Sequence, residues 1–274
     1  MKKEETQATA RTLWADIEKI RTGAPLVHNI TNYVVMNSSA NALLALGASP
    51  VMAHAKEEVE EMTSIAQALV INIGTLSKHW VESMFLAAET AGRRGIPFVL
   101  DPVGAGATKY RTETCLKLLQ KVSPAVIRGN ASEIRALLSS EAKTKGVDSL
   151  SEAEKAVEAA QRLAEKYDCT VSISGKVDYI VDRSRRHRIS NGHSLMPRVT
   201  GMGCAATALT GAFAAVNQDP FMAAVHAMAT MGIAGEIAGQ KASGPGSLQM
   251  HFLDTLHKLS KKDIEGRLKA ENAV

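Results

Sequence analysis

The feature that most constrains this chain is the alternation of short apolar segments with helical segments along its first two-thirds. The apolar segments are rich in Val, Ile and Leu, which is typical of strands buried on both faces of a parallel sheet. Successive strands joined by helices form right-handed βαβ units. The expected strands are residues 25–30, 51–53, 69–73, 96–101, 124–128 and 169–174. The sequence therefore predicts an α/β fold with a mainly parallel central sheet flanked by helices.

Two shorter segments, residues 178–182 and 186–190, are joined by polar turn residues and predict a short antiparallel edge on this sheet. The expected helices are residues 10–21, 32–46, 56–68, 78–94, 110–121, 151–167, 204–217, 220–240, 245–259 and 260–271, with one more opening at 129–133. The polar segment 139–150 is an expected linker, but it separates no independent cores. Residues 1–274 are therefore expected to form a single domain with flexible ends at 1–9 and 268–274.

Composition excludes several classes of function. The net charge is +4 and aromatic residues make up 4% of the chain, which is unlike a nucleic-acid-binding surface with stacking aromatics. The three cysteines are not spaced as C-x-x-C and predict neither a disulfide framework nor a zinc site. The N-terminal residues lack the apolar region of a signal peptide. The chain contains no run of about 18 apolar residues, so no membrane span is predicted. We therefore expect a cytoplasmic protein without nucleic-acid or membrane partners.

The most distinctive local segment is Thr200-Gly-Met-Gly-Cys204, which precedes a run of small residues with helical character. Its two glycines permit a tight turn with positive φ just before the helix begins. The first amides of a helix have no intrahelical partner and its N-terminal end is positive, so the segment favours binding of an anion such as phosphate. Cys204 falls in the first turn, where the pKa of a thiol tends to fall. A glycine pair before a helix also occurs in purely structural turns, so other parts of the chain must support this interpretation.

Support comes from residues at or just after the ends of the predicted strands. They are Asn32, Met52, Asp101, Arg128, Glu133 and Ser174. The carboxyl ends of parallel strands meet at one edge of the sheet, where α/β proteins bind ligands. A cation, two carboxylates able to hold a hydrated divalent metal ion, a hydroxyl and an anion site are what phosphoryl transfer requires. The chain has no Walker A sequence, so it is not predicted to be a P-loop enzyme.

Each of these residues also has a structural interpretation when it is taken alone. Asp101 can cap the turn before Pro102, and Arg128 can form an ion pair with Glu133. Met52 can be a core residue. Their joint order along the chain favours the functional interpretation.

Longer motifs around these residues resemble the hydroxyethylthiazole kinases of thiamine salvage, a family with the ribokinase-like fold. The matching segments are His28-Asn-Ile-Thr-Asn-Tyr-Val-Val35, Leu43-Leu-Ala-Leu-Gly-Ala-Ser-Pro50, Ile71-Asn-Ile-Gly-Thr75, Leu100-Asp-Pro-Val-Gly104, Ile127-Arg-Gly-Asn-Ala-Ser-Glu-Ile134, Val199-Thr-Gly-Met-Gly-Cys204, Gly244-Pro-Gly-Ser247 and Phe252-Leu-Asp-Thr-Leu256. They follow one another in order over most of the chain. The segments around Arg128 and Cys204 are together far more specific than a single glycine pattern.

The resemblance implies ATP-dependent phosphorylation of the primary alcohol of 4-methyl-5-(2-hydroxyethyl)thiazole. By position, it assigns thiazole contacts to Met52, Gly201 and Asn32, ATP-phosphate contacts to Arg128 and Ser174, and Mg²⁺, held through water, to Asp101 and Glu133. Sugar kinases of the broader fold carry Asp where this chain has Cys204, and the thiazole kinases are similar to this chain in having Cys there. Cys204 is therefore the expected catalytic residue, acting as a weak base or as a hydrogen-bond orienter.

The resemblance also implies a homotrimer whose substrate pockets lie between subunits. The apolar segment Phe221 to Ala238 is expected to form a helix that serves either packing or assembly. Three other functions stay open: a hydroxymethylpyrimidine kinase or similar small-alcohol kinase, a non-catalytic nucleotide or thiazole sensor, and a thiol enzyme with Cys204 as nucleophile. The last is weakened because no catalytic His pattern is evident in the sequence.

Overall fold

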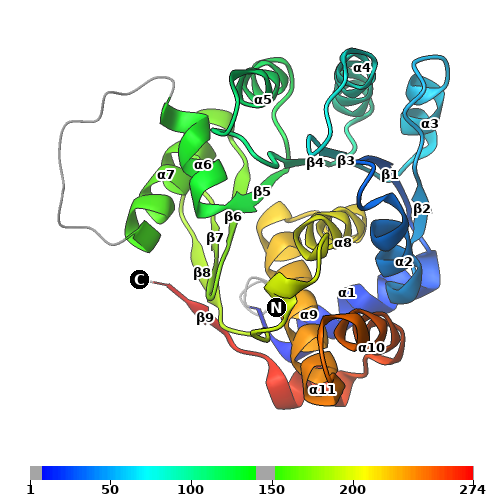
Figure 1. Cartoon of the computed structure of the whole chain (residues 1–274), viewed down its shortest axis with the longest axis vertical. Helices are drawn as coiled ribbons and strands as arrows, with labels where there is room; N and C mark the ends of the chain where they lie inside the picture. Colours follow the sequence, from blue (N-terminus) through cyan, green and yellow to red (C-terminus); the bar gives the residue numbers. More distant parts are fainter. Residues whose placement is uncertain (1–7, 140–151, 274) are drawn as a thin grey trace.

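The computed structural model describes residues 8–139 and 152–273. A nine-stranded sheet runs through it in the order β2-β1-β3-β4-β5-β6-β7-β8-β9 (Figure 1). The strands are β1 (Leu26–Ile30), β2 (Ser49–Val51), β3 (Ala68–Asn72), β4 (Phe98–Asp101), β5 (Val126–Asn130), β6 (Thr170–Ser174), β7 (Asp178–Val181), β8 (Arg186–Ile189) and β9 (Ala270–Asn272). β1 to β6 pair in parallel, and β7 to β9 add an antiparallel edge. The predicted α/β fold with a mainly parallel sheet and an antiparallel edge is confirmed.

Helices cover both faces of this sheet (Figure 1). One face carries α3 (Val59–Ile65), α4 (Lys78–Arg94), α5 (Lys109–Lys121), α6 (Ala131–Ser139) and α7 (Glu152–Tyr167). The other face carries α1 (Ala10–Gly23), α2 (Met36–Leu46), α8 (Met202–Val216), α9 (Pro220–Lys241), α10 (Pro245–Lys258) and α11 (Lys261–Arg267), and the short 3-10 helix η1 (Met196–Arg198) packs against α10. Because alternate strand residues point to opposite faces, Leu69 and Ile71 of β3 join one hydrophobic core and Val70 joins the other.

α8 lies close to the sheet because the residues that face the strands are small. A Cβ on Gly211 would lie 2.5 Å from Cγ2 of Val70 and 3.1 Å from Cγ1 of Val27. A larger residue at this position would push the helix away from β1 and β3. The small-residue run therefore lets α8 pack closely on the sheet, and its first turn lies at the carboxyl edge of the parallel strands.

α9 supplies more of the core on the same face than any other element. Among the described residues it is the one helix long and apolar enough to cross a membrane, but 89% of its most apolar window is buried inside the protein. Of the two roles expected for residues 221–238, the structure therefore shows packing, because these residues have little surface left for assembly.

Several element boundaries differ from those predicted. The helix predicted over 260–271 ends at Arg267, and β9 pairs with β8 where a flexible end was expected. β9 has three residues, too few to show the alternation of apolar and polar residues that predicts a strand. It forms because it pairs with β8, and this pairing cannot be read from the local sequence. α2 begins at Met36 rather than at residue 32, which leaves residues 31–35 as a turn that carries Asn32. Residues 140–150 of the predicted linker and the predicted helix start at Ser151 lie outside the described residues.

Candidate active site

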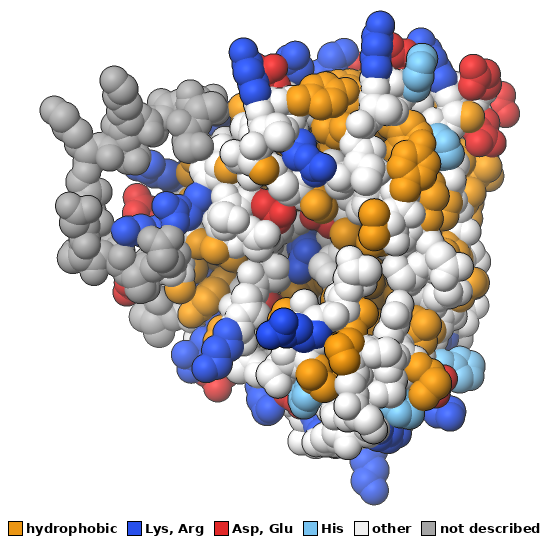
Figure 2. All heavy atoms as spheres, in the orientation of Figure 1, with side chains coloured by type: hydrophobic (Ala, Val, Ile, Leu, Met, Phe, Trp, Pro, Cys, Tyr) orange, Lys and Arg blue, Asp and Glu red, His pale blue; other side chains and the backbone are white. Residues whose placement is uncertain are grey.

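A cavity of about 820 Å³ lies where the carboxyl ends of β4, β5 and β6 meet the N-terminus of α8. Figure 2 shows a hollow between β5 and α8, with acidic and basic side chains at its walls. Six of the predicted site residues line this cavity: Asp101, Arg128, Glu133, Ser174, Gly201 and Cys204. Residues from distant parts of the chain are thus brought together at the edge of the sheet where parallel α/β folds bind ligands.

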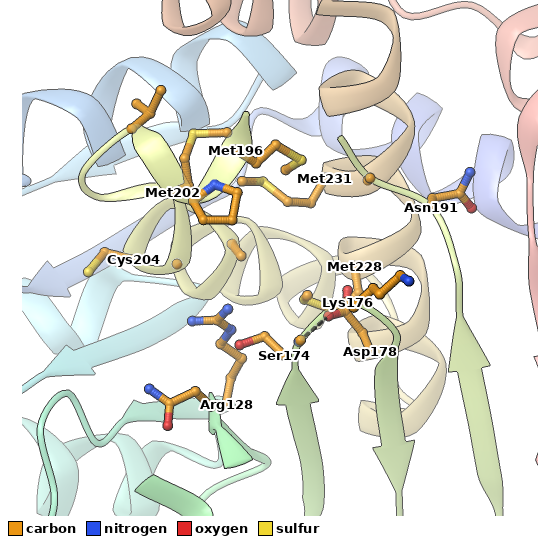
Figure 3. A pocket seen from close by; sticks show the side chains of 18 of the residues that line it. Arg128, Ser174, Lys176, Asp178, Asn191, Met196, Met202, Cys204, Met228 and Met231 are labelled. Carbon is orange, nitrogen blue, oxygen red and sulfur yellow. Dashed lines mark hydrogen bonds between the residues drawn. The ribbon is translucent and has the colours of Figure 1, made fainter. Parts of the chain in front are cut away.

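Arg128 of β5 is a buried cation that forms no direct ion pair with another described residue, although its charge acts on the nearby carboxyl groups of Asp101 and Asp178. Its side chain is directed toward α8 (Figure 3), and a Cβ on Gly203 would lie 2.8 Å from its Nη1. Arg128 is 7% exposed, and its Nε has no hydrogen-bond partner among the described residues. The ion pairs between described residues do not include the predicted alternative of Arg128 with Glu133. A buried guanidinium beside the positive end of a helix requires an anionic ligand.

Asp101 ends β4 and is 1% exposed. Its Oδ2 accepts hydrogen bonds from Asn72 Nδ2 and from Thr207 Oγ1, each at 2.7 Å. Burial raises the pKa of Asp101 to about 6, against the lowering effects of Arg128 and of both donors. The carboxyl group is therefore mostly ionised at neutral pH. Its Oδ1 receives no hydrogen bond from any residue that the structure describes.

Glu133 is held by the start of α6. Its Oε2 accepts from the Asn130 amide and its Oε1 accepts from the Gly104 amide, both at 2.8 Å. The Asn130 side chain returns a bond by accepting from the Glu133 amide at 3.0 Å, which completes a capping box. One backbone bond to each oxygen fixes the carboxylate and leaves further lone pairs free for a ligand or a water.

The donor set at this site suits a metal ion that keeps most of its own water. In the described ranges, no group of three or more His, Cys, Asp or Glu side chains is placed to hold a metal ion. Mg²⁺ usually binds to one or two carboxylates, to substrate phosphates and to several waters. Asp101 and Glu133, both on the cavity wall, fit that arrangement.

Cys204 lies in the first turn of α8, but its thiol is not activated. Burial raises its pKa to about 11, and the negative charge of Asp101 adds to the rise. The expectation that this pKa would fall is wrong here, because desolvation and the charge of Asp101 outweigh the lowering effects of Asn72, Asn32 and Arg128. Asn32 Nδ2 lies within hydrogen-bond distance of Cys204 Sγ, at 3.5 Å. A neutral thiol at neutral pH disfavours the alternative of a cysteine nucleophile.

Gly201 caps α8 with a φ of 84°, so the predicted positive-φ turn is confirmed. A Cβ there would lie 2.8 Å from Cγ1 of Val35, which precedes α2. Glycine is therefore required both by the backbone and by the close approach of the two segments. The turn leaves the first amides of α8 facing the same cavity as Arg128.

Ser174 ends β6, and its hydroxyl lies 3.4 Å from the Gly129 carbonyl, to which it donates a long hydrogen bond. In Figure 3 it lies beside Arg128, as expected for two groups that contact one anion.

Two predicted residues are not on the cavity wall. Met52 follows β2 and is half-buried away from the cavity. Asn32 is buried behind Cys204 and contacts the site through Cys204 and through Asn72.

Sequence reasoning missed two groups of residues at this site. Asn72 and Thr207 hold Asp101, and the signal for each was a polar residue inside an otherwise apolar strand or helix. The far wall is formed by Lys176, Asp178, Asn191, Met196, Met228 and Met231 (Figure 3). No local pattern marks these residues, since their side chains meet only when α9 and the segment before α8 pack beside β6 and β7.

Comparison with known proteins agrees with this geometry. The model of the hydroxyethylthiazole kinase family matches residues 17–262. A hydroxyethylthiazole kinase of Syntrophus aciditrophicus is 61% identical over 264 residues, which cover 96% of this chain and 98% of that protein. The structure of a hydroxyethylthiazole kinase protein from Pyrococcus horikoshii OT3 is similar with a TM-score of 0.90 at 46% identity, covering 96% of this chain and 100% of that chain.

A ribokinase-like superfamily protein from Enterococcus faecalis is only 12% identical but has a TM-score of 0.67, over 95% of this chain and 92% of that chain. This likeness concerns the fold alone, and it confirms the predicted ribokinase-like architecture. The family match spans nearly all of the described fold, and every residue of the cavity wall lies within it. The chain belongs to the hydroxyethylthiazole kinase family.

Proposed function

We propose that this protein transfers the γ-phosphoryl group of ATP to the hydroxyl of 4-methyl-5-(2-hydroxyethyl)thiazole, a step of thiamine salvage. The observation that carries the proposal is the Arg128 guanidinium, which is buried beside the first turn of α8 and forms no direct ion pair with any described residue. A kinase of this family brings a polyphosphate to such a place, and the phosphate supplies the missing negative charge.

The phosphate end of ATP is bound by Arg128, by the first amides of α8 and by the Ser174 hydroxyl. Arg128 neutralises charge on the phosphates, and the amides stabilise the oxygens on which charge develops during transfer. These donors are held in place before the substrate arrives, so little reorganisation is needed during the reaction.

Asp101 and Glu133 hold Mg²⁺ through water in this proposal. A bound ion would neutralise charge on the phosphates. The two carboxylates are already fixed by hydrogen bonds from Asn72, Thr207 and backbone amides, so they would orient the water molecules of such an ion.

The acceptor side is formed by Gly201, Cys204, Asn32 and Met52. Gly201 leaves room for the alcohol, and the Cys204 thiol, contacted by Asn32, orients the acceptor hydroxyl by a hydrogen bond. Because the transition state is loose and the acceptor proton can leave late, a strong base is not required. Met52 lies away from the cavity of its own chain, so we assign its thiazole contact to a pocket completed in the assembled oligomer.

We further propose that the protein is a cytoplasmic homotrimer and that each chain forms a single domain. One sheet passes through all of the described parts of the chain, which supports the single domain. Tyr33 and Val34, next to Asn32, are 61% and 65% exposed, which supports a subunit contact close to the acceptor side.

The direct test is ATP consumption in the presence of the thiazole alcohol and Mg²⁺, with mass detection of its phosphate monoester. We expect stoichiometric formation of ADP and the monoester. A parallel reaction offers hydroxymethylpyrimidine, and preferential phosphorylation of that alcohol would replace the thiazole assignment. Tight binding of both ligands without turnover would instead identify a sensor.

A further inference from the structure

Asp101 is the most deeply buried charged group of the site, and two side chains from different elements donate to one of its oxygens. Asn72 reaches Oδ2 from the end of β3, and Thr207 reaches the same atom from the second turn of α8. Both donors are buried themselves, Asn72 with 1% and Thr207 with 0% of its surface exposed. A carboxylate with two donors on one oxygen presents the other oxygen to its surroundings.

The hydrogen-bond network fixes the direction of both contacts. Asn72 Oδ1 accepts from Asn32 Nδ2 at 2.8 Å and from the Gly74 amide at 2.9 Å, so its Nδ2 must be the group that faces Asp101. Thr207 has one hydroxyl proton, with the Gly203 carbonyl 3.3 Å away and Asp101 Oδ2 at 2.7 Å. The shorter contact is to the charged acceptor, which makes it the stronger bond.

We propose that Thr207 and Asn72 are positioning residues that hold Asp101 by Oδ2 and thereby direct Oδ1 into the cavity, toward the water shell of the metal ion. The inference rests on the proposed role of Asp101 at that ion. Asn72 also contacts Asn32, which lies against Cys204, so the same network links the acceptor side to the metal side. Neither residue is expected to touch a substrate.

Thr207→Val tests the proposal, because it removes the hydroxyl while keeping the shape of a buried side chain. A hydrogen bond to a charged group contributes enough that kcat should fall roughly tenfold or more. The Mg²⁺ concentration at half-maximal rate should rise several-fold, whereas KM for the thiazole alcohol should stay unchanged. Thr207→Ser keeps the donor and should restore both values to within about twofold of wild type.

A binding measurement separates positioning from a general loss of activity. Calorimetric titration with a non-hydrolysable ATP analogue should show unchanged affinity without metal, since Arg128 and the α8 amides are intact. The strengthening of that affinity by Mg²⁺ should be reduced in Thr207→Val and retained in Thr207→Ser. If Thr207→Val does not fold, Thr207→Ala removes the same donor in a residue that favours the helix, and the same measurements apply.

Thr210→Val is the matched control. Thr210 lies three residues further along α8, is equally buried, and donates only to the Ala206 carbonyl of its own helix. The proposal is overturned if Thr207→Val keeps wild-type Mg²⁺ dependence, if Thr210→Val causes the same loss, or if folded Thr207→Ser is as impaired as Thr207→Val. Asp101→Asn separates a failure of the proposed function from a failure of this inference. Full activity of Asp101→Asn would refute the role of Asp101 at the metal ion. An impaired Asp101→Asn together with a normal Thr207→Val would refute only the positioning role of Thr207.

Discussion

Arg128 shows how a single residue can be placed for a ligand at the expense of the fold. Its guanidinium is buried, its Nε has no partner, and the nearest helix presents its positive end. A buried guanidinium that forms no direct ion pair with a described residue destabilises the protein until an anion binds. A residue of this kind is expected to matter for activity and not for stability.

We therefore expect Arg128→Met to separate the two properties. kcat/KM for ATP should fall about a hundredfold or more, as it does when a donor to a developing oxyanion is removed. The melting temperature should stay the same or rise, because the buried charge is gone. Steady-state kinetics and thermal unfolding measure both, with Arg94→Met at the exposed end of α4 as control. Strong destabilisation by Arg128→Met would show that the arginine serves the fold.

Cys204 is expected to react slowly with alkylating agents, because its raised pKa leaves almost no thiolate at neutral pH. Modification by iodoacetamide at neutral pH should be slower than that of free cysteine. Cys204→Ala should slow turnover with ATP affinity largely intact, and Cys204→Asp should stay active by supplying a carboxylate base. An inactive Cys204→Asp variant that folds and binds ATP, or a covalent phosphoryl-cysteine intermediate, would contradict the orienting role.

At the scale of elements, the start of α8 depends on the contact between Gly201 and the turn before α2. Gly201→Ala should lower the free energy of unfolding by about 1–3 kcal/mol, because alanine is strained at positive φ and its Cβ would meet Val35. Gly246→Ala is the control, since a Cβ there meets nothing within 4 Å in the first turn of α10. Chemical denaturation of both variants measures the difference, and equal stabilities would contradict the close approach.

β1 is tied to α3 by His28, which is fully buried. His28 Nε2 lies 2.7 Å from the Ala53 carbonyl, to which it donates, and Nδ1 lies 2.9 Å from the Thr63 hydroxyl. Burial lowers the pKa of His28 below its ordinary value of 6.5. Both contacts are internal to the fold.

A lowered histidine pKa predicts the sign of a pH effect on stability. Below pH 6.5 the His28 ring of the unfolded chain binds a proton, while the buried ring of the folded protein stays neutral. The free energy of unfolding therefore falls as pH decreases through this range. The stabilisation is fully present above pH 6.5. Its loss should amount to at most about 1.4 kcal/mol per pH unit. In His28→Gln this part of the pH dependence should disappear, and in His257→Gln, at an exposed position of α10, it should persist.

The elements that could be predicted from sequence are those whose pattern is local. β3, β4 and β5 are continuous apolar runs that end in distinctive residues, so Asp101 and Arg128 were placed at the correct edge. β9 and the cavity wall of α9 depend on partners far away in the chain, which leave no local trace. The Cys204 pKa was misjudged for the same reason, since its burial depends on side chains from several elements.

At the scale of the whole molecule, large apolar side chains remain exposed near the acceptor side. Tyr33 and Val34 precede α2, and Leu44 on that helix is 58% exposed. Exposed apolar side chains of this size, here at both ends of α2, are typical of a subunit contact. They are the surface on which the proposed trimer is expected to close.

We expect Val34→Glu to dissociate the oligomer and to raise KM for the thiazole alcohol, because it places a charge in an apolar contact and opens a shared pocket. Light scattering at micromolar protein should give a trimer mass for wild type and a smaller mass for the variant. Ile65→Glu is the control, since Ile65 is 62% exposed at the far end of α3. A fully active wild-type monomer would refute the assembly.

The order of the elements along the chain has a consequence for synthesis on the ribosome. All six parallel strands are made by residue 174, but α8 and α9, which cover much of one sheet face, begin only at residues 202 and 220. Val27, Val70, Val99 and Val126 belong to the core on that face. In a growing chain they lack the cover of α8 and α9 until residues 202–241 have emerged, so we expect the nascent sheet to expose apolar surface to which chaperones bind.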